Sequence, residues 1–283
     1  ADMRGWTVTA ARIAGFGKRL EEEEREPGTI EKYLREVRAF AAWAGGRGVS
    51  KEVTGGWKER LRSEGLRAET INSKLSALNR FLSYLGREEC RVKYLKIQRR
   101  LFRGPERELT RAEYKRLLET ARGMGRERLA LMMELICATG IRVSEVKYIT
   151  AEAVRAGRAE VSLKGKIRTI LIPGKLCRKL EKYMRKKKTV SGEVFLTRNG
   201  KGLTRRQIWA EMKGLCERAG VEASKVYPHN LRHLFARTFY GMCKDVARLA
   251  DVLGHSSIET TRIYLMSTGE EHARQMDRLG LIF

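Results

Sequence analysis

A histidine and a tyrosine lie nine residues apart in the stretch Leu253–Tyr264, which reads LGHSSIETTRIY. Gly254 can end one helix and the serines after His255 can cap the next, so the pattern predicts a turn followed by a short helix that carries Tyr264. A phenol is a weak nucleophile at neutral pH because its pKa is about 10. It attacks well when cations surround the electrophile, and cations suit phosphate best. Taken alone, the stretch fits a surface helix with a half-buried tyrosine and a capping histidine.

The second half of the chain supplies the required cations at the ends of its expected elements. Arg142 follows a Thr-Gly helix stop, and Lys164 lies at the tip of an expected β-hairpin. His229 and Arg232 open a helix that is entered through a proline, and their spacing of three places them on one helix face. Singly, each is an ordinary surface charge or helix cap. The prediction of a site depends on the whole set: Arg142, Lys164, His229, Arg232, His255 and Tyr264.

This set suits transesterification of a phosphodiester. Two guanidiniums can clamp the non-bridging oxygens and stabilise the charge that grows in the transition state. A hairpin lysine can protonate the departing 5′-oxygen, one histidine can accept the phenol proton, and the other can bind the phosphate. The lysine is Lys164 or Lys166, and we favour Lys164 because it ends the first strand. No carboxylate cluster suited to Mg²⁺ is evident, so we expect neither metal nor cofactor.

The charge of the chain points to a polyanionic partner. The 283 residues carry 59 Lys and Arg against 34 Asp and Glu, which gives a net charge of +25 and a pI of about 10.2. Such self-repulsion is best tolerated when the usual partner is nucleic acid. No apolar run is long enough to span a membrane, and no signal peptide opens the chain, so we expect a cytoplasmic protein. The five cysteines form no Cys-x-x-Cys pair and are expected to be reduced thiols.

Helical periodicity dominates the first 90 residues. Apolar spacing predicts helices at about 7–25, from Thr29 after a Pro27-Gly28 break, at about 51–63, and from Thr70 to Gly86. These helices form a compact all-α domain at 1–90. A basic stretch with poor periodicity follows at 91–108 and is typical of an interdomain linker.

The capping box that starts at Thr110 predicts that a second domain begins there and covers 109–283. Helices are expected up to about residue 149. Two β-like runs follow at 159–163 and 167–172, with a third strand expected at 194–196. Helical patterns then return at about 204–219, 231–241, 244–252, 257–265 and 270–279. The four tryptophans are expected to be packing residues. The fold class is therefore mainly α with a small antiparallel sheet in the second domain.

Three local motifs resemble the tyrosine recombinase (phage integrase) family. They are ATGIRVSE at 138–145, HNLRH at 229–233 and LGHSSIETTRIY at 253–264. In size the chain is similar to Xer-like and transposon-integrase members. The resemblance implies a SAM-like core-binding domain and a catalytic domain that form a C-shaped clamp. It also implies that Tyr264 is the nucleophile, that the other five residues of the set support it, and that Glu145 braces Arg142.

By the same resemblance, the protein would be a site-specific recombinase that cuts and rejoins DNA through a 3′-phosphotyrosyl intermediate without ATP or metal. It would act as a homotetramer on two double-stranded DNA sites, at the nucleoid, and be monomeric or weakly associated when free. The tail from residue 269 would dock on a neighbouring protomer, or alternatively pack on its own domain. The process would be integration or excision of a mobile element, or Xer-type resolution. Two other functions stay open: a type IB topoisomerase-like enzyme that relaxes DNA, and a catalytically silent DNA-binding protein.

Overall fold

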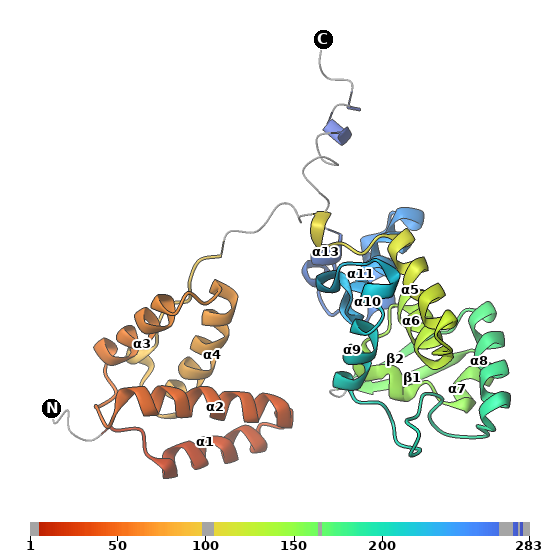
Figure 1. Cartoon of the computed structure of the whole chain (residues 1–283). Helices are drawn as coiled ribbons and strands as arrows, with labels where there is room; N and C mark the ends of the chain where they lie inside the picture. The colour runs from red at the N-terminus through yellow and green to blue at the C-terminus, as the bar shows by residue number, and fades with distance from the viewer. Residues whose placement is uncertain (1–5, 98–104, 164–165, 266–273, 277, 280–283) are drawn as a thin grey trace. The chain divides into compact units, whose positions relative to one another are not determined.

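The structure is a computed structural model that describes residues 6–97, 105–163, 166–265, 274–276 and 278–279. For six of these residues it describes the backbone alone: Pro105, Leu163, Lys166, Glu259, Ile263 and Tyr264. The chain divides into two compact units, Ala1–Arg99 and Arg100–Phe283, each with its own apolar core. Figure 1 gives the labels of the helices and strands.

All the regular secondary structure in the described part of the first unit is helical. Its elements are α1 (Ala10–Glu22), α2 (Pro27–Ala44), α3 (Lys51–Ser63), α4 (Ala68–Tyr84) and the 3₁₀ turn η1 (Glu88–Cys90). Two of the expected helix starts were wrong by two residues. Helix α2 begins at Pro27 and not at Thr29, because a proline in the first turn lacks only an N–H that would have no helical partner anyway. Helix α4 begins at Ala68, before Thr70.

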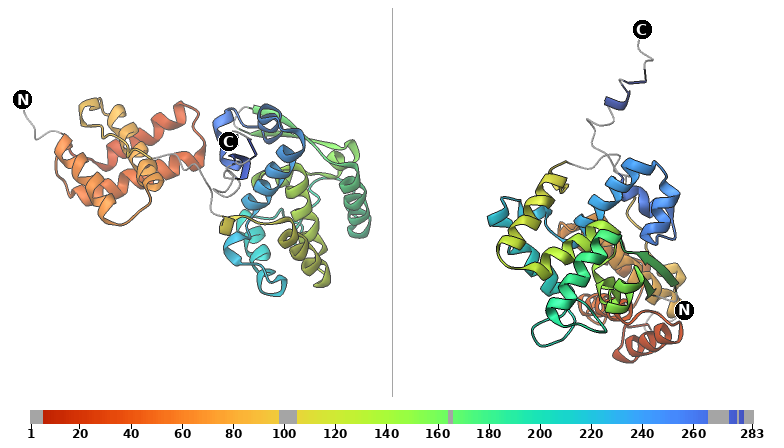
Figure 2. Two further views of the ribbon diagram at one scale, coloured as in Figure 1. Left: turned by 90° about the horizontal axis from the view of Figure 1, so that it is seen from above. Right: turned by 90° about the vertical axis from the view of Figure 1, so that its right-hand side faces the viewer.

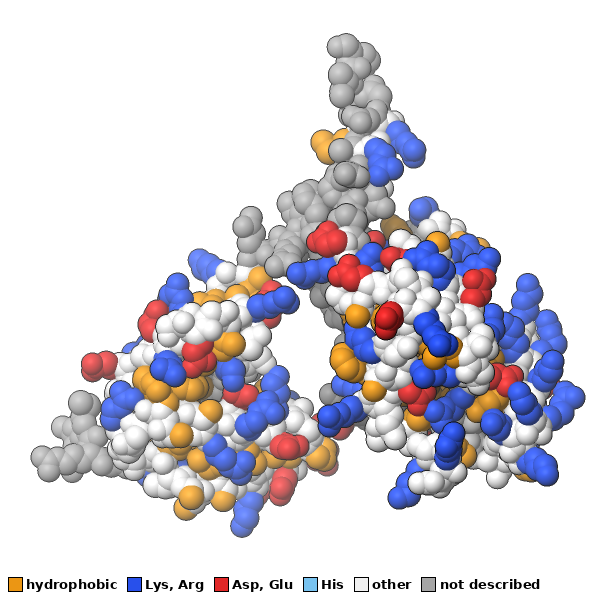
Figure 3. All heavy atoms as spheres, viewed as in Figure 1, with side chains coloured by type: hydrophobic (Ala, Val, Ile, Leu, Met, Phe, Trp, Pro, Cys, Tyr) orange, Lys and Arg blue, Asp and Glu red, His pale blue; other side chains and the backbone are white. Residues whose placement is uncertain are grey.

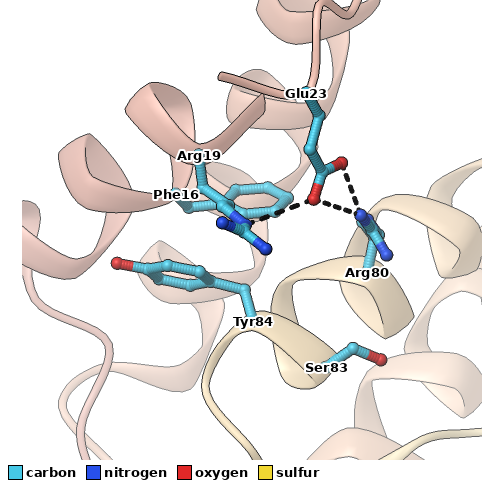
Figure 4. Close-up of a pocket in the computed structure, with 6 residues that line it drawn as sticks. All are labelled: Phe16, Arg19, Glu23, Arg80, Ser83 and Tyr84. Atoms are coloured by element: carbon cyan, nitrogen blue, oxygen red, sulfur yellow. Dashed lines mark hydrogen bonds and ion pairs between the residues drawn. The ribbon is translucent and has the colours of Figure 1, made fainter. Parts of the chain in front are cut away.

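Aromatic rings fill the core of the first unit. The rings of Phe16 and Phe81 lie 5.3 Å apart edge to face, and those of Phe40 and Trp57 lie 5.9 Å apart in the same arrangement. Such pairs contribute about 1 kcal/mol beyond the burial of their area. A small surface pocket lies between α1 and α4 and is lined by both aromatic and charged side chains (Figure 4). Two of its lining residues form an ion pair, with Arg80 Nη2 2.5 Å from Glu23 Oε2.

The second unit combines helices with one hairpin. Before the hairpin lie η2 (Pro105–Arg107), α5 (Arg111–Gly123), α6 (Glu127–Thr139), η3 (Val143–Tyr148) and α7 (Ala151–Ala156). The hairpin consists of β1 (Arg158–Leu163) and β2 (Lys166–Leu171). After it lie α8 (Gly174–Lys187), α9 (Arg205–Lys213), α10 (Cys216–Ala219), η4 (Ala223–Lys225), α11 (Pro228–Cys243), α12 (Val246–Leu253) and α13 (Ile258–Tyr264). The expected capping box is present, since Thr110 and Glu113 exchange hydrogen bonds of 2.8 and 3.1 Å.

Helix α6 runs through the centre of this unit and α11 packs along it, as the views of Figures 1 and 2 agree. Seven apolar side chains of α6 are buried: Leu129, Ala130, Leu131, Met132, Met133, Leu135 and Ile136. Helix α11 begins at Pro228, and its first turns lie beside the carboxyl end of α6, where Arg232 contacts Gly140. The predicted site lies here, next to the residues that follow α6.

The strand expected at 194–196 was wrong. Among the described residues, this region contributes only two isolated bridges, Thr150 with Glu193 and Leu196 with Gly202. The sheet of the described chain is the two-stranded antiparallel hairpin, with Val161 opposite Arg168 and Leu163 opposite Lys166. The reason is local, because the turn at 197–201 folds the segment back on itself before a ladder can form.

Strand β2 alternates between the solvent and the core. Ile167 and Leu171 are 75% and 73% exposed, whereas Ile170 is 4% exposed. Arg168 shares the inward face with Ile170, because residues two apart on a strand point the same way. A guanidinium on the core face of a strand requires buried acceptors, and it finds them in the site described next.

Four of the remaining sequence expectations concern Trp209, the tail helix, a membrane span and the cysteines. Trp209 is 49% exposed on α9 and stacks under the ammonium of Lys213, so the expectation that it is a packing residue was wrong. The helix expected at about 270–279 lies mostly outside the described residues. In the described part of the chain, no helix is both long and apolar enough to cross a membrane. All five cysteines are free thiols.

Candidate active site

Arg142 stands at the start of η3 and is held by a buried carboxylate. Gly140 ends α6 with a left-handed backbone, so the chain turns and exposes the next residues. The Arg142 backbone N–H donates to Glu145 Oε2 at 2.8 Å, and its Nη1 donates to Glu145 Oε1 at 3.0 Å. Glu145 is 1% exposed, while the Arg142 side chain is 39% exposed. The first arginine of the predicted site is therefore fixed at its base and open to solvent at its head.

Glu145 binds a second arginine, Arg168 of β2. Arg168 Nη2 donates to Glu145 Oε2 at 2.6 Å, and Nη1 donates to the carbonyl oxygen of Val252 at 3.1 Å. Burial lowers the pKa of Arg168, partly offset by the charge of Glu145, while the charge of Arg142 lowers it further. One carboxylate thus serves two guanidiniums, and positive charge exceeds negative charge at this point.

Arg232 lies on the first turns of α11 and is 1% exposed. Its Nη1 donates to the carbonyl oxygen of Gly140, and its Nη2 donates to the carbonyl oxygen of Leu253 at 2.8 Å. The same Nη2 lies 3.0 Å from Nε2 of His255. These three acceptors are neutral groups. They belong to the ends of α6 and α12, where the negative end of each helix dipole favours a cation.

The contact with Arg232 fixes the tautomer of His255. A guanidinium has only donors, so Nε2 of His255 must be the acceptor and the proton must be on Nδ1. Nδ1 lies 2.9 Å from the hydroxyl oxygen of Thr261, which is fully buried on α13, and donates to it. Burial lowers the pKa of His255 to about 4, and the charges of Arg232, Arg142 and Arg168 act in the same direction. His255 is therefore neutral at pH 7, in a site of positive potential.

His229 is the second residue of α11, one turn before Arg232. Its ring packs edge to face against that of His233, with centroids 4.9 Å apart, and His233 is buried. The charge of His229 also contributes to the lowered pKa of His255, so the two histidines share one site.

Two predicted site residues are not described at the level of side chains. Lys164 lies outside the described residues, and Lys166 is described as the backbone of β2 only. Tyr264 is the last residue of α13, again as backbone. The structure thus brings together four members of the predicted set: Arg142, His229, Arg232 and His255. In the part of the chain that the structure describes, no group of three or more metal-ligating side chains gathers.

The sequence reasoning missed Arg168 and Thr261. A signal for Arg168 existed, because it is a charged residue on the inward face of an otherwise apolar alternation at 168–172. Thr261 left no such signal, because its partner is set by the position of the turn before α13. Two glycines are also part of the site. A Cβ on Gly140 would come within 2.4 Å of Phe235, and one on Gly254 within 2.5 Å of the Arg168 stem.

Comparison with known proteins agrees with this geometry. Residues 107–271 match the phage integrase family, and residues 13–89 match the phage integrase N-terminal SAM-like domain. The chain belongs to the phage integrase family. Within it, the chain is 29% identical to the tyrosine recombinase XerA of Thermococcus kodakarensis, over 95% of each chain. It is 30% identical to the tyrosine recombinase XerC of Roseiflexus castenholzii, over 89% of this chain and 88% of the relative.

Solved structures share the fold of this recombinase. The Tn1549 transposon integrase in complex with circular intermediate DNA has a TM-score of 0.71 and 16% identity, over 95% of this chain and 99% of that one. The XerH site-specific recombinase bound to its difH substrate has a TM-score of 0.67 and 19% identity, over 95% and 89%. The chain is thus a tyrosine-type site-specific DNA recombinase with a mainly helical fold, as its sequence predicted.

Proposed function

We propose that this recombinase cuts DNA by attack of Tyr264 on a phosphodiester held between Arg142 and Arg232. The observation that carries the proposal is the meeting of two arginines and a neutral histidine at the ends of α6, α11 and α12. The bond between phosphorus and the 5′-oxygen breaks while a bond to the tyrosyl oxygen forms. The product is a 3′-phosphotyrosyl link and a free 5′-hydroxyl, and the reverse reaction rejoins the strands.

The two arginines would enter this reaction differently. Arg142 already presents its head to solvent, so a phosphate oxygen can meet it directly. Arg232 is 1% exposed, so it must turn away from at least one of its carbonyl partners to reach the phosphate. Its described acceptors are neutral groups, and an arriving anion would therefore compete well with them for its donors.

His255 would link phosphate binding to the nucleophile. It is bonded to Arg232 on one side and to Thr261 on the other, and Thr261 lies three residues before Tyr264 on the same short helix. Once a phosphate takes up the donors of Arg232, the negative charge raises the pKa of His255, and its Nε2 can carry a proton to a phosphate oxygen. In this scheme His229 accepts the phenol proton, and Lys164, or alternatively Lys166, protonates the leaving 5′-oxygen.

The first unit offers a surface that suits a DNA backbone. Lys32 of α2 donates to Ser73 of α4 at 2.6 Å, and Glu36 of α2 binds Lys74 of α4 at 2.6 Å. Glu36 is 7% exposed, and hydrogen bonds from Lys74 and Arg35 lower its pKa against the opposing effect of burial. Basic side chains also crowd the visible face of the second unit, most densely over α8 (Figure 3). We propose that the α2–α4 surface binds the backbone of the DNA duplex.

Double-stranded DNA as the partner accords with the family and with the DNA complexes among the solved structures. We further propose assembly into a homotetramer on two DNA sites, a monomeric or weakly associated free state, and action in the cytoplasm at the nucleoid. The biological process would be integration or excision of a mobile element, or Xer-type resolution.

The test uses nicked suicide duplexes whose central ~30 base pairs are random, a length that covers a pair of half-sites about one helical turn apart. Incubation with the protein should trap a covalent adduct that resists SDS, and sequencing the trapped DNA would give the target. Tyr264→Phe should form no adduct. Tyr94→Phe is a control, because Tyr94 is an exposed tyrosine of the other unit.

An adduct that persists in Tyr264→Phe would contradict the nucleophile assignment. Relaxation of supercoiled plasmids that lack the recovered target, without strand exchange, would indicate a topoisomerase instead. Absence of any adduct, with retained DNA binding, would indicate a catalytically silent protein.

A further inference from the structure

We infer that Arg168 is a positioning residue that anchors the tip of the β1–β2 hairpin, and with it the general-acid lysine, to the two segments that carry Arg142 and His255. The inference extends the proposed function, because it assigns how the proton donor is held.

The contacts of Arg168 join three separate pieces of the chain. From β2 it reaches Glu145, which braces Arg142, at 2.6 Å. It also reaches the carbonyl oxygen of Val252 at 3.1 Å. Its stem crosses Gly254, where any Cβ would come within 2.5 Å of its Cδ. A side chain that contacts the η3 segment, the end of α12 and the residue before His255 fixes the hairpin relative to the rest of the site.

Arg168 lies close enough to the tip of the hairpin along the strand for its contacts to restrict the movement of the tip. The tip is the pair Leu163 and Lys166, and Arg168 lies opposite Val161, two residue pairs away. The buried side chains of β2 that the structure describes lie farther from the tip, beginning with Ile170. Nearer to the tip, Ile167 is 75% exposed. Arg168, whose side chain is 15% exposed, is therefore the described inward-facing side chain of β2 that comes first after the tip.

A second hydrogen bond, between neutral groups and exposed to solvent, also holds the hairpin near its tip. Tyr148 of η3 donates its hydroxyl proton to the carbonyl oxygen of Ser162 on β1 at 2.8 Å. Ser162 is one residue pair from the tip. Both strands of the hairpin are thus bonded close to the tip, by Arg168 on β2 and by Tyr148 on β1.

Arg142 depends on Arg168 much less than the hairpin does. Glu145 holds Arg142 through two hydrogen bonds: Oε1 accepts from the Arg142 guanidinium, and Oε2 accepts from the Arg142 backbone and from Arg168. Both bonds to Arg142 can persist without Arg168. The Nε of Arg168 is buried and has no hydrogen-bond partner among the described residues, which is a cost to stability. An apolar side chain on this face would avoid that cost but would lose both outward bonds. The loss of Arg168 should therefore affect protonation of the leaving group more than charge stabilisation.

A leaving group that needs no proton separates these two effects. In a duplex with sulfur in place of the 5′-oxygen, the P–S bond breaks and the thiolate leaves unprotonated, since thiols have a pKa of about 8.5. Arg168→Met should slow adduct formation on the ordinary duplex by about 10²-fold, the lower end of a general-acid effect. On the sulfur duplex it should come within about threefold of wild type, as should Lys164→Ala if Lys164 is the donor.

Arg158→Met is the matched control, because Arg158 is an exposed arginine on the same hairpin at the end away from the tip. It should match wild type on both duplexes. If Arg168→Met does not fold, Arg168→Lys replaces it. This variant keeps the charge but reaches only one acceptor, so a smaller defect with the same rescue by sulfur is expected. Tyr148→Phe should show a still smaller defect of the same kind.

Amide hydrogen exchange tests the anchor independently of any reaction. In Arg168→Met, but not in Arg158→Met, the peptide that covers 158–171 should exchange at least about tenfold faster, as expected for a segment that opens locally. Adduct formation by wild type on the ordinary duplex reports the proposed function alone. An unchanged exchange rate in Arg168→Met, or a cleavage defect that sulfur does not rescue, would overturn the inference.

Discussion

The two halves of the phosphate site hold their arginines by different means. On the η3 side, which we call the open half, the Glu145 carboxylate holds Arg142 at its base and leaves 39% of its side chain exposed. On the α11 side, which we call the closed half, Arg232 is 1% exposed and contacts two main-chain carbonyls and the imidazole of His255.

The difference is one of charge compensation. The Glu145 carboxylate, which Arg168 shares, offsets part of the guanidinium charge, so Arg142 can stay ordered with its head exposed to water. The described acceptors of Arg232 are neutral groups that orient it. Burial lowers the pKa of His255, and the charge of Arg232, with those of Arg142 and Arg168, lowers it further. An anion that enters the site would therefore gain more from Arg232, and would also disturb more of the fold.

The largest expected effect separates the two arginines by their contribution to stability. Arg232→Ala and Arg142→Ala should each slow adduct formation by about 10²–10³-fold, because each removes a donor to the transition-state charge. Arg232→Ala should lower the free energy of unfolding by about 2–3 kcal/mol, since it leaves buried acceptors unsatisfied. Arg142→Ala should lower it less, because Glu145 keeps its ion pair with Arg168. Urea unfolding of both variants measures this. Equal stability losses would contradict the distinction between the two halves.

Removal of the carboxylate should destabilise the open half. Glu145→Gln leaves two guanidiniums beside a neutral amide, and breaking such a buried pair costs about 3 kcal/mol. The expected rate loss is about tenfold, because Arg142 keeps its place but loses its orientation. Glu134→Gln is the control. Glu134 also pairs with two cations, Arg122 and Lys179, but both are about half exposed, so its loss should cost less than about 1 kcal/mol. Equal costs would mean that burial of Glu145 adds nothing.

The sequence was sufficient to predict the helices of the first unit and the hairpin, because helix periods, caps and turn signals are local. The structure brings four of the predicted site residues together, and the roles assigned to the set stay predictions. The sequence was not sufficient for Arg168 and Thr261, whose roles come from contacts between segments far apart in the chain. It also misplaced the start of α2, where Pro27 was read as a break although the first turn of a helix tolerates it. The burial of Arg232 had no local signal, because its acceptors are carbonyls that any residue carries.

Gly140 allows a smaller and more selective change to the closed half. Its backbone is left-handed, with φ at 66°, and an added Cβ would clash with Phe235 at 2.4 Å. Gly140→Ala should therefore cost the strain of a left-handed alanine, about 1 kcal/mol, and about 1–2 kcal/mol more for the clash. Gly157→Ala isolates the strain, because Gly157 ends α7 at φ 70° with nothing near its Cβ. The additional loss in Gly140→Ala should be accompanied by a lower cleavage rate, because the Gly140 carbonyl binds Arg232. Equal losses in the two variants would show that Phe235 moves away freely.

The smallest effect is a pH dependence that belongs to the closed half. His255 has a pKa of about 4 in the folded protein, whereas in the unfolded chain a histidine titrates at about 6.5. The unfolded state therefore takes up a proton first as the pH falls. The stability that His255 contributes is fully present above pH 6.5 and is lost progressively toward pH 4.

His255→Asn cannot titrate, so the difference in unfolding free energy between wild type and this variant should shrink between pH 7.5 and pH 5. We expect a change of about 1 kcal/mol, reduced by solvent screening because the ring is only partly buried. Urea unfolding at the two pH values measures it. Inorganic phosphate should weaken the dependence, because an anion between the arginines cancels the potential that lowers the pKa of His255. A difference that is constant with pH would show that the pKa of His255 is not lowered in the folded protein, by burial or by the arginines.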